Sequence, residues 1–347
     1  MLVKDLDSLD LGFDIVIIGA GAAGCTLASN LSEKFKILIV DSRDFPRKKA
    51  CSGIIVSEGK EFLGTGLDES ILVEPYNLDI QYVDWDNNLE NFSKKGFLNS
   101  DRYALDNFLF DKIRNKKNVS FMKNTSFLEF TNTRDGLHKV VMIESNGSVK
   151  PIITRYLVGC DGALSNVRKR VDSREVPFYI GVQEFIRSNQ TIDKAYFIFD
   201  SEITDFYSWV IPKKPFIEIG ALLEPRDSKE KFSLLREKIY KKFNISGDGM
   251  FNSAIVLRPN SVKDICLGKD SILLCGEAAG LISPSSAEGI SYALRSGKYC
   301  ADAFNSGKDP FSEYSANCKQ IIVRLVEKFE KSRVISDKNK RKKMFKL

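Results

Sequence analysis

The chain has 347 residues, of which 43% are hydrophobic and 28% charged, a composition typical of a globular protein long enough for two intertwined domains. No apolar run approaches the roughly 18 residues that a membrane-spanning helix needs, and residues 1–7 lack the basic-then-apolar layout of a secretory signal. Residues 338–347 hold six of the 52 Lys and Arg residues, so the remaining 46 balance the 46 Asp and Glu residues, and this balance argues against a nucleic-acid partner.

The seven cysteines include no Cys-x-x-Cys pair. Reduced thiols in a cytoplasmic protein are therefore expected, rather than a disulfide framework or a zinc site. The basic segment 338–347 is open to two interpretations. It is either a frayed, solvated helix end or a peripheral contact with an anionic membrane surface, helped by Met344, Phe345 and Leu347.

Residues 13–40 have the pattern of a βαβ unit. A β-branched run at 13–18 predicts a buried strand, residues 25–35 have helical spacing, and the apolar run at 36–40 predicts a second strand that ends at Asp41.

The turn between the first strand and the helix is Gly19-Ala20-Gly21-Ala22-Ala23-Gly24. Gly19 permits a tight turn, Gly21 lets the backbone approach a pyrophosphate, and Gly24 lets helix and strand pack closely. Phosphates then bind at the N-terminus of the helix. Asp41, 20 residues after Gly21, is placed to accept both hydroxyls of an adenosine ribose and would repel the 2′-phosphate of NADP. This pattern predicts a nucleotide site.

The middle of the chain reads as a loop, a helix and several strands. The loop at 42–60 carries three consecutive basic residues and then Cys51-Ser52-Gly53. Further elements are predicted by hydrophobic spacing: strands within 71–97 with turns at 86–88 and 95–96, an amphipathic helix at 101–114, and a small meander at 119–130, 139–144 and 150–158. The only histidine, His138, is expected in an exposed hairpin turn, so histidine-based or metal chemistry is not expected.

The second half begins with β-type runs between 176 and 262 that are interrupted by a charged helix at 228–243. An apolar run at 271–275 then leads into a glycine-containing loop at 276–290 and a helix-like stretch at 287–304, and residues 310–346 have helical spacing. One phosphate-type loop near each end of the chain suggests a long cofactor held at both ends, and FAD has that shape. Asp161-Gly162 lies between the two loops and by itself reads as a common Asp-Gly turn.

The three loops, in this order, resemble those of a flavoprotein group that includes p-hydroxybenzoate hydroxylase-type monooxygenases, flavin-dependent halogenases and geranylgeranyl reductases, over residues 13–297. The resemblance implies that the first loop binds the ADP half of FAD, that Asp161 and Gly162 support the cofactor site, and that the late loop binds the ribityl chain. Glu277 stands where the family has Asp. Arg102 resembles an arginine that touches the cofactor, and its alternative is an ion pair with Asp106 at i,i+4.

The cofactor-binding residues expected on these grounds are Gly19, Gly21, Ala22, Ala23, Gly24, Asp41, Ser42, Cys51, Ser52, Gly53, Arg102, Phe127, Asp161, Gly162, Gly276, Glu277, Gly289 and Ile290. The helix that starts near Ala287 is expected to aim its positive end at the flavin, where it would stabilise the charge that develops on reduction.

Two segments resemble the geranylgeranyl reductase branch in particular. Residues 46–54 resemble its Cys-Gly-Gly stretch near the flavin, and residues 206–213 with Gly220 resemble its Tyr-x-Trp-x-Phe-Pro motif with a downstream glycine. The resemblance implies hydride transfer from reduced flavin to a carbon–carbon double bond of an apolar, prenyl-type substrate, with Cys51, Tyr207 and Trp209 in the substrate pocket. Core packing is the alternative for Trp209, and a small buried hydrophobe is the alternative for Cys51.

Because no second dinucleotide loop is visible, the electrons are expected from an external donor, either NAD(P)H that docks transiently or a reduced protein carrier. Two rival functions stay open. A flavin-dependent monooxygenase or halogenase would act on an aromatic small molecule, since Trp209-Val-Ile-Pro212 matches half of a halogenase motif. A non-catalytic flavin-binding redox protein would turn over no substrate.

The expected fold is α/β, with a Rossmann-like FAD-binding domain made of residues 1–75, 100–175 and 264–309. An inserted antiparallel β-sheet substrate domain is expected at 76–99 and 176–263, followed by a C-terminal helical segment with the basic tail at 310–347.

Overall fold

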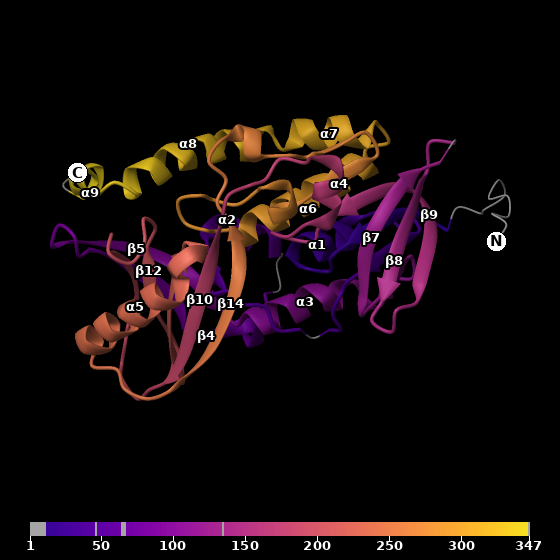
Figure 1. Cartoon of the computed structure of the whole chain (residues 1–347). Coiled ribbons are helices and arrows are strands. Elements are labelled where there is room, and N and C mark those ends of the chain that lie inside the picture. The colour runs from indigo at the N-terminus through magenta and orange to yellow at the C-terminus, as the bar shows by residue number, and fades with distance from the viewer. Residues whose placement is uncertain (1–11, 46, 64–66, 134, 346–347) are drawn as a thin grey trace.

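The computed structural model describes residues 12–345 apart from 46, 64–66 and 134, and shows two eight-stranded sheets with helices packed against them (Figure 1). The helices are α1 (Ala22–Asn30), α2 (Ser57–Leu63), α3 (Arg102–Arg114), α4 (Asn166–Val171), α5 (Ser228–Phe243), α6 (Ile290–Asn305), α7 (Pro310–Asn317), α8 (Lys319–Ile335) and α9 (Lys338–Met344). Short 3₁₀ turns are η1 (Glu69–Ile71), η2 (Pro225–Asp227), η3 (Val262–Asp264) and η4 (Gly276–Ala279).

The first sheet has a parallel centre. Its strands are β1 (Phe13–Ile18), β2 (Ile37–Val40), β6 (Val119–Met122), β7 (Thr125–Asn132), β8 (His138–Glu144), β9 (Val149–Gly159), β15 (Gly268–Lys269) and β16 (Ile272–Leu274). The main order is β15-β16-β9-β1-β2-β6, while β8 pairs with β9 and with β7. β1 runs parallel to both of its neighbours, and its residues 15–18 are buried, as the continuous apolar run of a central parallel strand predicts.

The second sheet is mostly antiparallel. Its strands are β3 (Ile54–Ile55), β4 (Leu72–Asp84), β5 (Leu89–Ser100), β10 (Phe178–Arg187), β11 (Ala195–Phe199), β12 (Ser208–Lys213), β13 (Phe216–Leu223) and β14 (Gly249–Leu257), in the order β14-β10-β13-β12-β11-β4-β5-β3. Helix α5 covers one face through Phe232, Leu235 and Ile239. The other face carries an aromatic cluster that includes Phe199, Phe206, Tyr207 and Trp209.

These two sheets confirm the predicted α/β class with a Rossmann-like domain, an added β-sheet and C-terminal helices. The division into domains rests on which sheet each strand joins, and we propose it with one adjustment. β3 and the first residues of β4 belong to the second sheet, although they fall within the segment 1–75 assigned to the cofactor-binding domain. Residues 1–11 of that segment lie outside the described residues.

Helix predictions hold best where a local signal marks the end of the helix. The helix expected at 101–114 is α3, whose N-cap Asp101 accepts a hydrogen bond from Ala104 N at 2.8 Å, and the charged helix at 228–243 is α5. The helix expected at 25–35 instead spans 22–30. The turn expected at 95–96 is wrong because β5 continues through it, where Asp79 Oδ1 accepts from both backbone N–H groups.

His138 is not exposed, contrary to expectation. It lies on β8 with 4% of its surface accessible. Its Nδ1 is 2.9 Å from Asn132 Oδ1 and its Nε2 is 2.7 Å from Ser271 Oγ. Burial lowers the pKa of His138, so the ring is a neutral link within the first sheet. The sequence could not show the Ser271 partner, which is 133 residues away.

The C-terminal helices α8 and α9 run over the molecule and end beside the second sheet (Figure 1), and α9 forms most of the basic tail. Arg341 is 1% exposed, and its guanidinium pairs with Asp84 at 3.0 Å and with Asp86. The expected solvated helix end is therefore wrong at Arg341, because two acids of the second sheet bind it.

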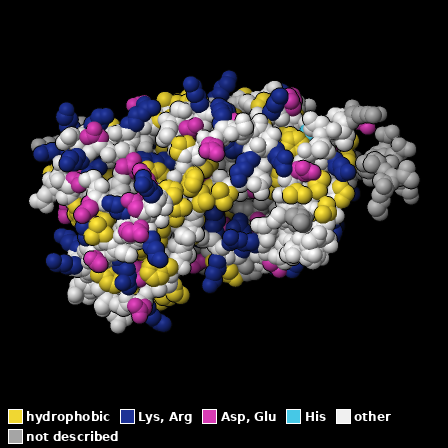
Figure 2. Space-filling model, in the orientation of Figure 1, with side chains coloured by type: hydrophobic (Ala, Val, Ile, Leu, Met, Phe, Trp, Pro, Cys, Tyr) yellow, Lys and Arg dark blue, Asp and Glu magenta, His cyan; other side chains and the backbone are white. Residues whose placement is uncertain are grey.

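The apolar residues of the tail also face the protein. Met344 and Phe345 pack against the aromatic cluster of the second sheet, and Leu347 lies outside the described residues. No helix in the described part of the chain is long and apolar enough to cross a bilayer. Basic side chains are spread across the face seen in Figure 2, with acidic side chains between them, in keeping with a charge-balanced body.

Candidate active site

One cavity of about 2120 Å³ is lined by residues of both sheets and of the C-terminal helices. A pocket for a single drug-sized ligand measures roughly 300–1,000 Å³, so this cavity has room for a cofactor and a second ligand. All the site residues predicted from the sequence line it except Gly24, Gly53 and Gly276, which lie behind its wall. The structure therefore brings together residues from widely separated parts of the chain.

The turn between β1 and α1 is shaped by glycine. Gly19 has φ +100°, and a Cβ there would lie 2.4 Å from Cys160 O, so no other residue fits. Gly21 is the N-cap of α1 and no side chain caps the helix. The first N–H groups of α1 therefore open onto the cavity, which Gly21, Ala22 and Ala23 line.

Asp41 is fixed at the end of β2, directly beside this turn. Its Oδ2 accepts from Ala20 N at 2.9 Å and its Oδ1 from Arg43 N at 3.0 Å. Ser42 follows and is exposed to the cavity. The carboxylate thus lies at the carboxyl edge of the parallel strands, where α/β folds bind nucleotides.

Arg47 is a site residue that the sequence analysis did not single out. Its Nη2 lies 3.2 Å from the place where a Cβ of Gly21 would be. Its Nε is buried without a hydrogen-bond partner in the described part of the chain, and the guanidinium lies 3.8 Å from Asp41 Oδ2 and 3.8 Å from Asp106 Oδ2. An unpaired guanidinium N–H beside an uncapped helix N-terminus fits a phosphate group. The signal was present in the basic run at 47–49.

Arg102 makes the ion pair that was its alternative role. Its Nε is 2.8 Å from Asp106 Oδ1, and both side chains are buried. Burial acts to raise the pKa of Asp106, but Arg102 and Arg47 hold it below its ordinary value. Arg102 also lines the cavity, so the ion pair orients this arginine without removing it from the site.

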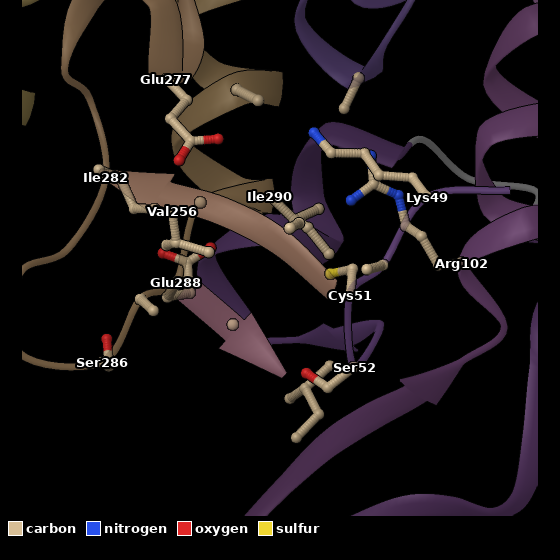
Figure 3. A pocket seen from close by; sticks show the side chains of 18 of the residues that line it. Lys49, Cys51, Ser52, Arg102, Val256, Glu277, Ile282, Ser286, Glu288 and Ile290 are labelled. Carbon is tan, nitrogen blue, oxygen red and sulfur yellow. The ribbon is translucent and has the colours of Figure 1, made fainter. Parts of the chain in front are cut away.

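Glu277, Lys49 and Arg102 face the same space (Figure 3). One oxygen of Glu277 accepts from Leu257 N at 2.9 Å, which ties the late loop to the end of β14. Burial raises the pKa of Glu277, while Lys49 and Arg102 act against that rise. Lys49 was also missed, although it belongs to the same basic run as Arg47.

The carboxylate of Asp161 is engaged with its own loop. It accepts from Ser165 Oγ at 2.5 Å and from Asn166 N at 2.8 Å, so it supports the start of α4. Burial raises the pKa of Asp161. The cavity is lined here by Asp161 and Gly162 and, from β7, by the buried Phe127.

Helix α6 begins at Ile290, three residues later than Ala287, where the sequence placed its start. Glu288 accounts for this, since it accepts from Ser291 N at 2.7 Å and from Ser291 Oγ at 2.8 Å. One N–H group of the helix start is therefore already bound. Burial raises the pKa of Glu288. Gly289, the N-cap of α6, and Ile290, its first residue, line the cavity.

The segment 51–53 is held against the end of β5. Ser100 donates to Gly53 O from its Oγ at 2.5 Å and from its N at 3.1 Å. Cys51 is half-buried, accepts from Gly53 N at 3.4 Å, and its thiol points into the cavity (Figure 3). Ser52 lies beside it on the cavity wall.

Tyr207 and Trp209 form an aromatic wall on the second sheet. The Tyr207 ring stacks on Phe206 at 4.4 Å, and its hydroxyl donates to Ser286 O at 2.7 Å. The Trp209 indole lies flat across Gly220, where a Cβ would be 2.4 Å from the ring. Both rings line the cavity and belong to a buried cluster, so Trp209 serves as core and as cavity wall.

A buried polar group lies beneath this wall and was not predicted. Glu218 is fully buried, and its Oε1 accepts from Trp209 Nε1 at 2.8 Å and from Gln183 Nε2 at 2.5 Å. Glu218 Oε2 and Gln183 Oε1 have no partner in the described part of the chain. Lys213, at the end of β12, lines the cavity nearby. The sequence signal was an acid inside the apolar strand 216–223.

A family model described as "FAD binding domain" matches residues 12–191. The chain belongs to this family and is an FAD-binding flavoprotein, as the three loops predicted. Protein CbrA of Shigella dysenteriae serotype 1 (strain Sd197) is 30% identical to it over 335 residues, which cover 93% of each chain.

Solved structures share the fold at low sequence identity. A geranylgeranyl bacteriochlorophyll reductase-like protein from Thermoplasma acidophilum superimposes with a TM-score of 0.81 at 16% identity, over 93% of this chain and 87% of that one. pqsL, a probable FAD-dependent monooxygenase from Pseudomonas aeruginosa, gives 0.73 at 15% identity, over 96% and 100% of the two chains. The fold is thus shared by flavoproteins with different reactions, and the site has to indicate which reaction this chain performs.

Proposed function

We propose that this FAD-dependent oxidoreductase reduces a carbon–carbon double bond of an apolar, prenyl-type substrate. The observation that carries the proposal is the aromatic wall of Tyr207 and Trp209, which faces the same cavity as the glycine turn of β1 and α1. Apolar rings suit an apolar chain. The fold of the reductase-like Thermoplasma protein supports the same class of reaction.

The residues near the first turn fit FAD. The uncapped start of α1 and the unpaired N–H of Arg47 would hold the pyrophosphate, and Asp41 would hold the adenosine ribose. Arg102, Lys49 and Glu277 would contact the middle of the cofactor. FAD, when bound and reduced, supplies a hydride to an electron acceptor.

Apolar side chains in another part of the cavity would keep water away from the reacting bond. Tyr207 and Trp209 present ring faces, and the C-terminal helices add Ile335, Met344 and Phe345 to the lining. The hydrogen bond from Tyr207 to Ser286 fixes the late loop against the aromatic wall. An apolar chain between these groups would be desolvated and oriented toward the cofactor end. The electrons would come from an external donor, NAD(P)H or a reduced protein carrier.

A flavin-dependent monooxygenase or halogenase is the second candidate. The fold of the probable monooxygenase pqsL supports it, because an aromatic substrate would also fit against Trp209. A flavin-binding redox protein without turnover is the third.

An anaerobic experiment separates the three. The FAD-loaded protein is reduced photochemically, mixed without oxygen with an unsaturated prenyl compound, and followed by flavin absorbance and by mass spectrometry of the lipid. The proposal expects reoxidation of the flavin together with one equivalent of the hydrogenated product, and no reoxidation with the saturated analogue. Reoxidation only after oxygen is admitted, with hydroxylation or halogenation of an aromatic compound, would favour the second candidate. Failure with both substrate classes would favour the third.

A further inference from the structure

Lys213 is a buried ammonium group on the wall of the cavity. It is the last residue of β12, it is 6% exposed, and it lines the cavity together with Trp209 and Ile211 of the same strand. Burying an ammonium is costly unless its donors find acceptors. The acceptors of its N–H groups therefore decide whether the charged form of Lys213 is stable at this place.

The protein satisfies Lys213 only in part. An ammonium has three N–H donors, and Nζ donates to Ser100 O at 2.8 Å. Within the described residues this is its one hydrogen bond, and no carboxylate lies within the 4.0 Å of an ion pair. Two donors are thus left for an acceptor that the described residues do not supply.

Glu218, the acid with the largest effect on Lys213, is held by other groups. Glu218 stands on β13 opposite Ile211 of β12, but its Oε1 is bound by Trp209 and Gln183. Burial lowers the pKa of Lys213, and Glu218, Cys51 and Asp101 act against this. These three groups offset part of the effect of burial without making a hydrogen bond or ion pair to the ammonium.

Lys213 also lies beside the segment expected near the flavin. Its acceptor Ser100 donates in turn to Gly53 O, two residues after Cys51. The unused donors are consequently close to the boundary between the cofactor end and the aromatic wall, where the reacting bond of a substrate would lie.

We propose that Lys213 binds the carbonyl oxygen of the substrate, and that the substrate is a prenyl-type α,β-unsaturated carbonyl compound. The inference rests on the proposed reductase function and adds the substrate class. A hydride adds readily to a double bond that a carbonyl group polarises.

A hydride supplied by reduced FAD would form the C–H bond at the β carbon, and the π electrons would move toward the carbonyl, whose oxygen would become an enolate. The Lys213 N–H groups donate to this oxygen more strongly in the enolate than in the neutral carbonyl, so the interaction accelerates the step. A proton from water then adds at the α carbon and gives the saturated carbonyl compound.

Binding of two matched probes tests the inference. The enal farnesal and the hydrocarbon farnesene are titrated into the FAD-loaded protein, and flavin absorbance and tryptophan fluorescence are followed. We expect farnesal to bind about tenfold more tightly than farnesene, because a hydrogen bond from a charged donor has this magnitude. Lys213→Met should remove the preference and leave the Kd for farnesene unchanged.

Two further variants control for misfolding and for the loss of a lysine elsewhere on the protein. Lys213→Met/Glu218→Gln removes both charges, so that no buried acid is left without a counter-charge if the single variant folds poorly, and it should also lack the preference. Lys229→Met, an exposed lysine on α5, should keep it.

A preference for farnesal that persists in both Lys213 variants would overturn the inference, and so would loss of FAD from them, because the ammonium would then bind the cofactor. Because the experiment measures binding, its result for Lys213 does not depend on whether the proposed reaction takes place. If the protein turns over substrate and the Lys213 variants still prefer farnesal, only the role of Lys213 is refuted. If the Lys213 variants lose the preference but the protein turns over no substrate, only the proposed reaction is refuted.

Discussion

The two walls of the cavity are built in different ways. The wall proposed to bind FAD, called the cofactor wall below, is made largely of backbone from consecutive elements, β1, α1 and β2, with glycine at the close approaches and Asp41 at the end of β2. The wall proposed to bind the substrate, called the substrate wall below, is made of side chains from β10, β12 and β13. A backbone site tolerates changes in side chain but not in backbone shape. A side-chain site depends on the register of three strands.

The two walls also differ in whether a polar group is open to the cavity or buried beneath its surface. On the cofactor wall, the unpaired N–H of Arg47 lies beside the open turn at Gly21. On the substrate wall, the carboxylate of Glu218 is sealed beneath the Trp209 ring. The unpaired N–H of Arg47 is therefore arranged to receive an anion, whereas the carboxylate of Glu218 holds a ring in place. Each of the following variants tests one side of this comparison.

The largest effect is expected at the cofactor wall. Gly21→Asp places a carboxylate at the uncapped start of α1, where it would repel the pyrophosphate. We expect complete loss of flavin absorbance in the purified protein with little change in far-UV circular dichroism. Asn146→Asp, which adds a carboxylate in an exposed turn and keeps the hydrogen bond from Ser148 N, is the control and should remain yellow. FAD retained in the Gly21 variant would refute the location of the cofactor site.

The C-terminal helix α9 is expected to stabilise the second sheet, against which it packs. Arg341→Met leaves Asp84 buried without its counter-charge, and loss of one partner of such a pair costs about 3–5 kcal/mol. Denaturant unfolding should show this loss, while Lys342→Met, an exposed neighbour on α9, should have almost no effect. A loss as small as that of the control would mean that the tail is not docked in solution.

A moderate effect is expected from Gly220→Ala. The new methyl group would meet the indole of Trp209 at 2.4 Å, and overpacking of this kind costs about 1–3 kcal/mol. The variant should keep FAD and bind farnesene more weakly, which would separate the two walls. Gly181→Ala on β10, where a Cβ would be 3.2 Å from the flexible end of Leu222, should disturb binding less. Equal loss of FAD and farnesene in the Gly220 variant would contradict the separation.

The smallest effect concerns Glu218 and pH. Burial raises the pKa of Glu218 above its ordinary 4.5, so the folded state binds this proton more tightly than the unfolded state. The stability gained from that proton is present below pH 4.5 and is lost as the pH rises through the elevated pKa.

Glu218→Gln removes this titration. The Tm of the wild type should fall relative to that of the variant as the pH rises from about 4.5 toward neutrality, by about a degree or two. A Tm difference that stays constant with pH, or that changes in favour of the wild type, would show that Glu218 is not strained by its burial.

Local sequence signals predicted the elements that form the cofactor wall, while the binding of FAD to it stays a prediction. The turn at Gly19–Gly24, the acid at Asp41 and the N-cap of α3 at Asp101 each act within a few residues or one βαβ unit. The basic run at 47–49 was visible too, but its role depends on how the loop returns to Gly21, which spacing does not show.

The substrate wall and the tail could not be read in the same way. Glu218 meets Gln183 through strand register, and Arg341 meets Asp84 across 257 residues of sequence. The sequence did not indicate the position of Lys213, because the acceptor of its ammonium, Ser100 O of β5, is 113 residues away. These contacts depend on the tertiary pairing of strands, and neither periodicity nor composition encodes that pairing in a single sequence.

The central claim is that one cavity holds FAD against the first wall and a substrate against the second. Electron density of the FAD-loaded protein with farnesal tests it most directly. We expect the pyrophosphate beside Gly21 and Arg47, the ribose at Asp41, and the enal between the flavin ring and Trp209 with its oxygen at Lys213. A flavin ring that itself fills the space against Trp209, leaving no room for a second ligand, would contradict the account.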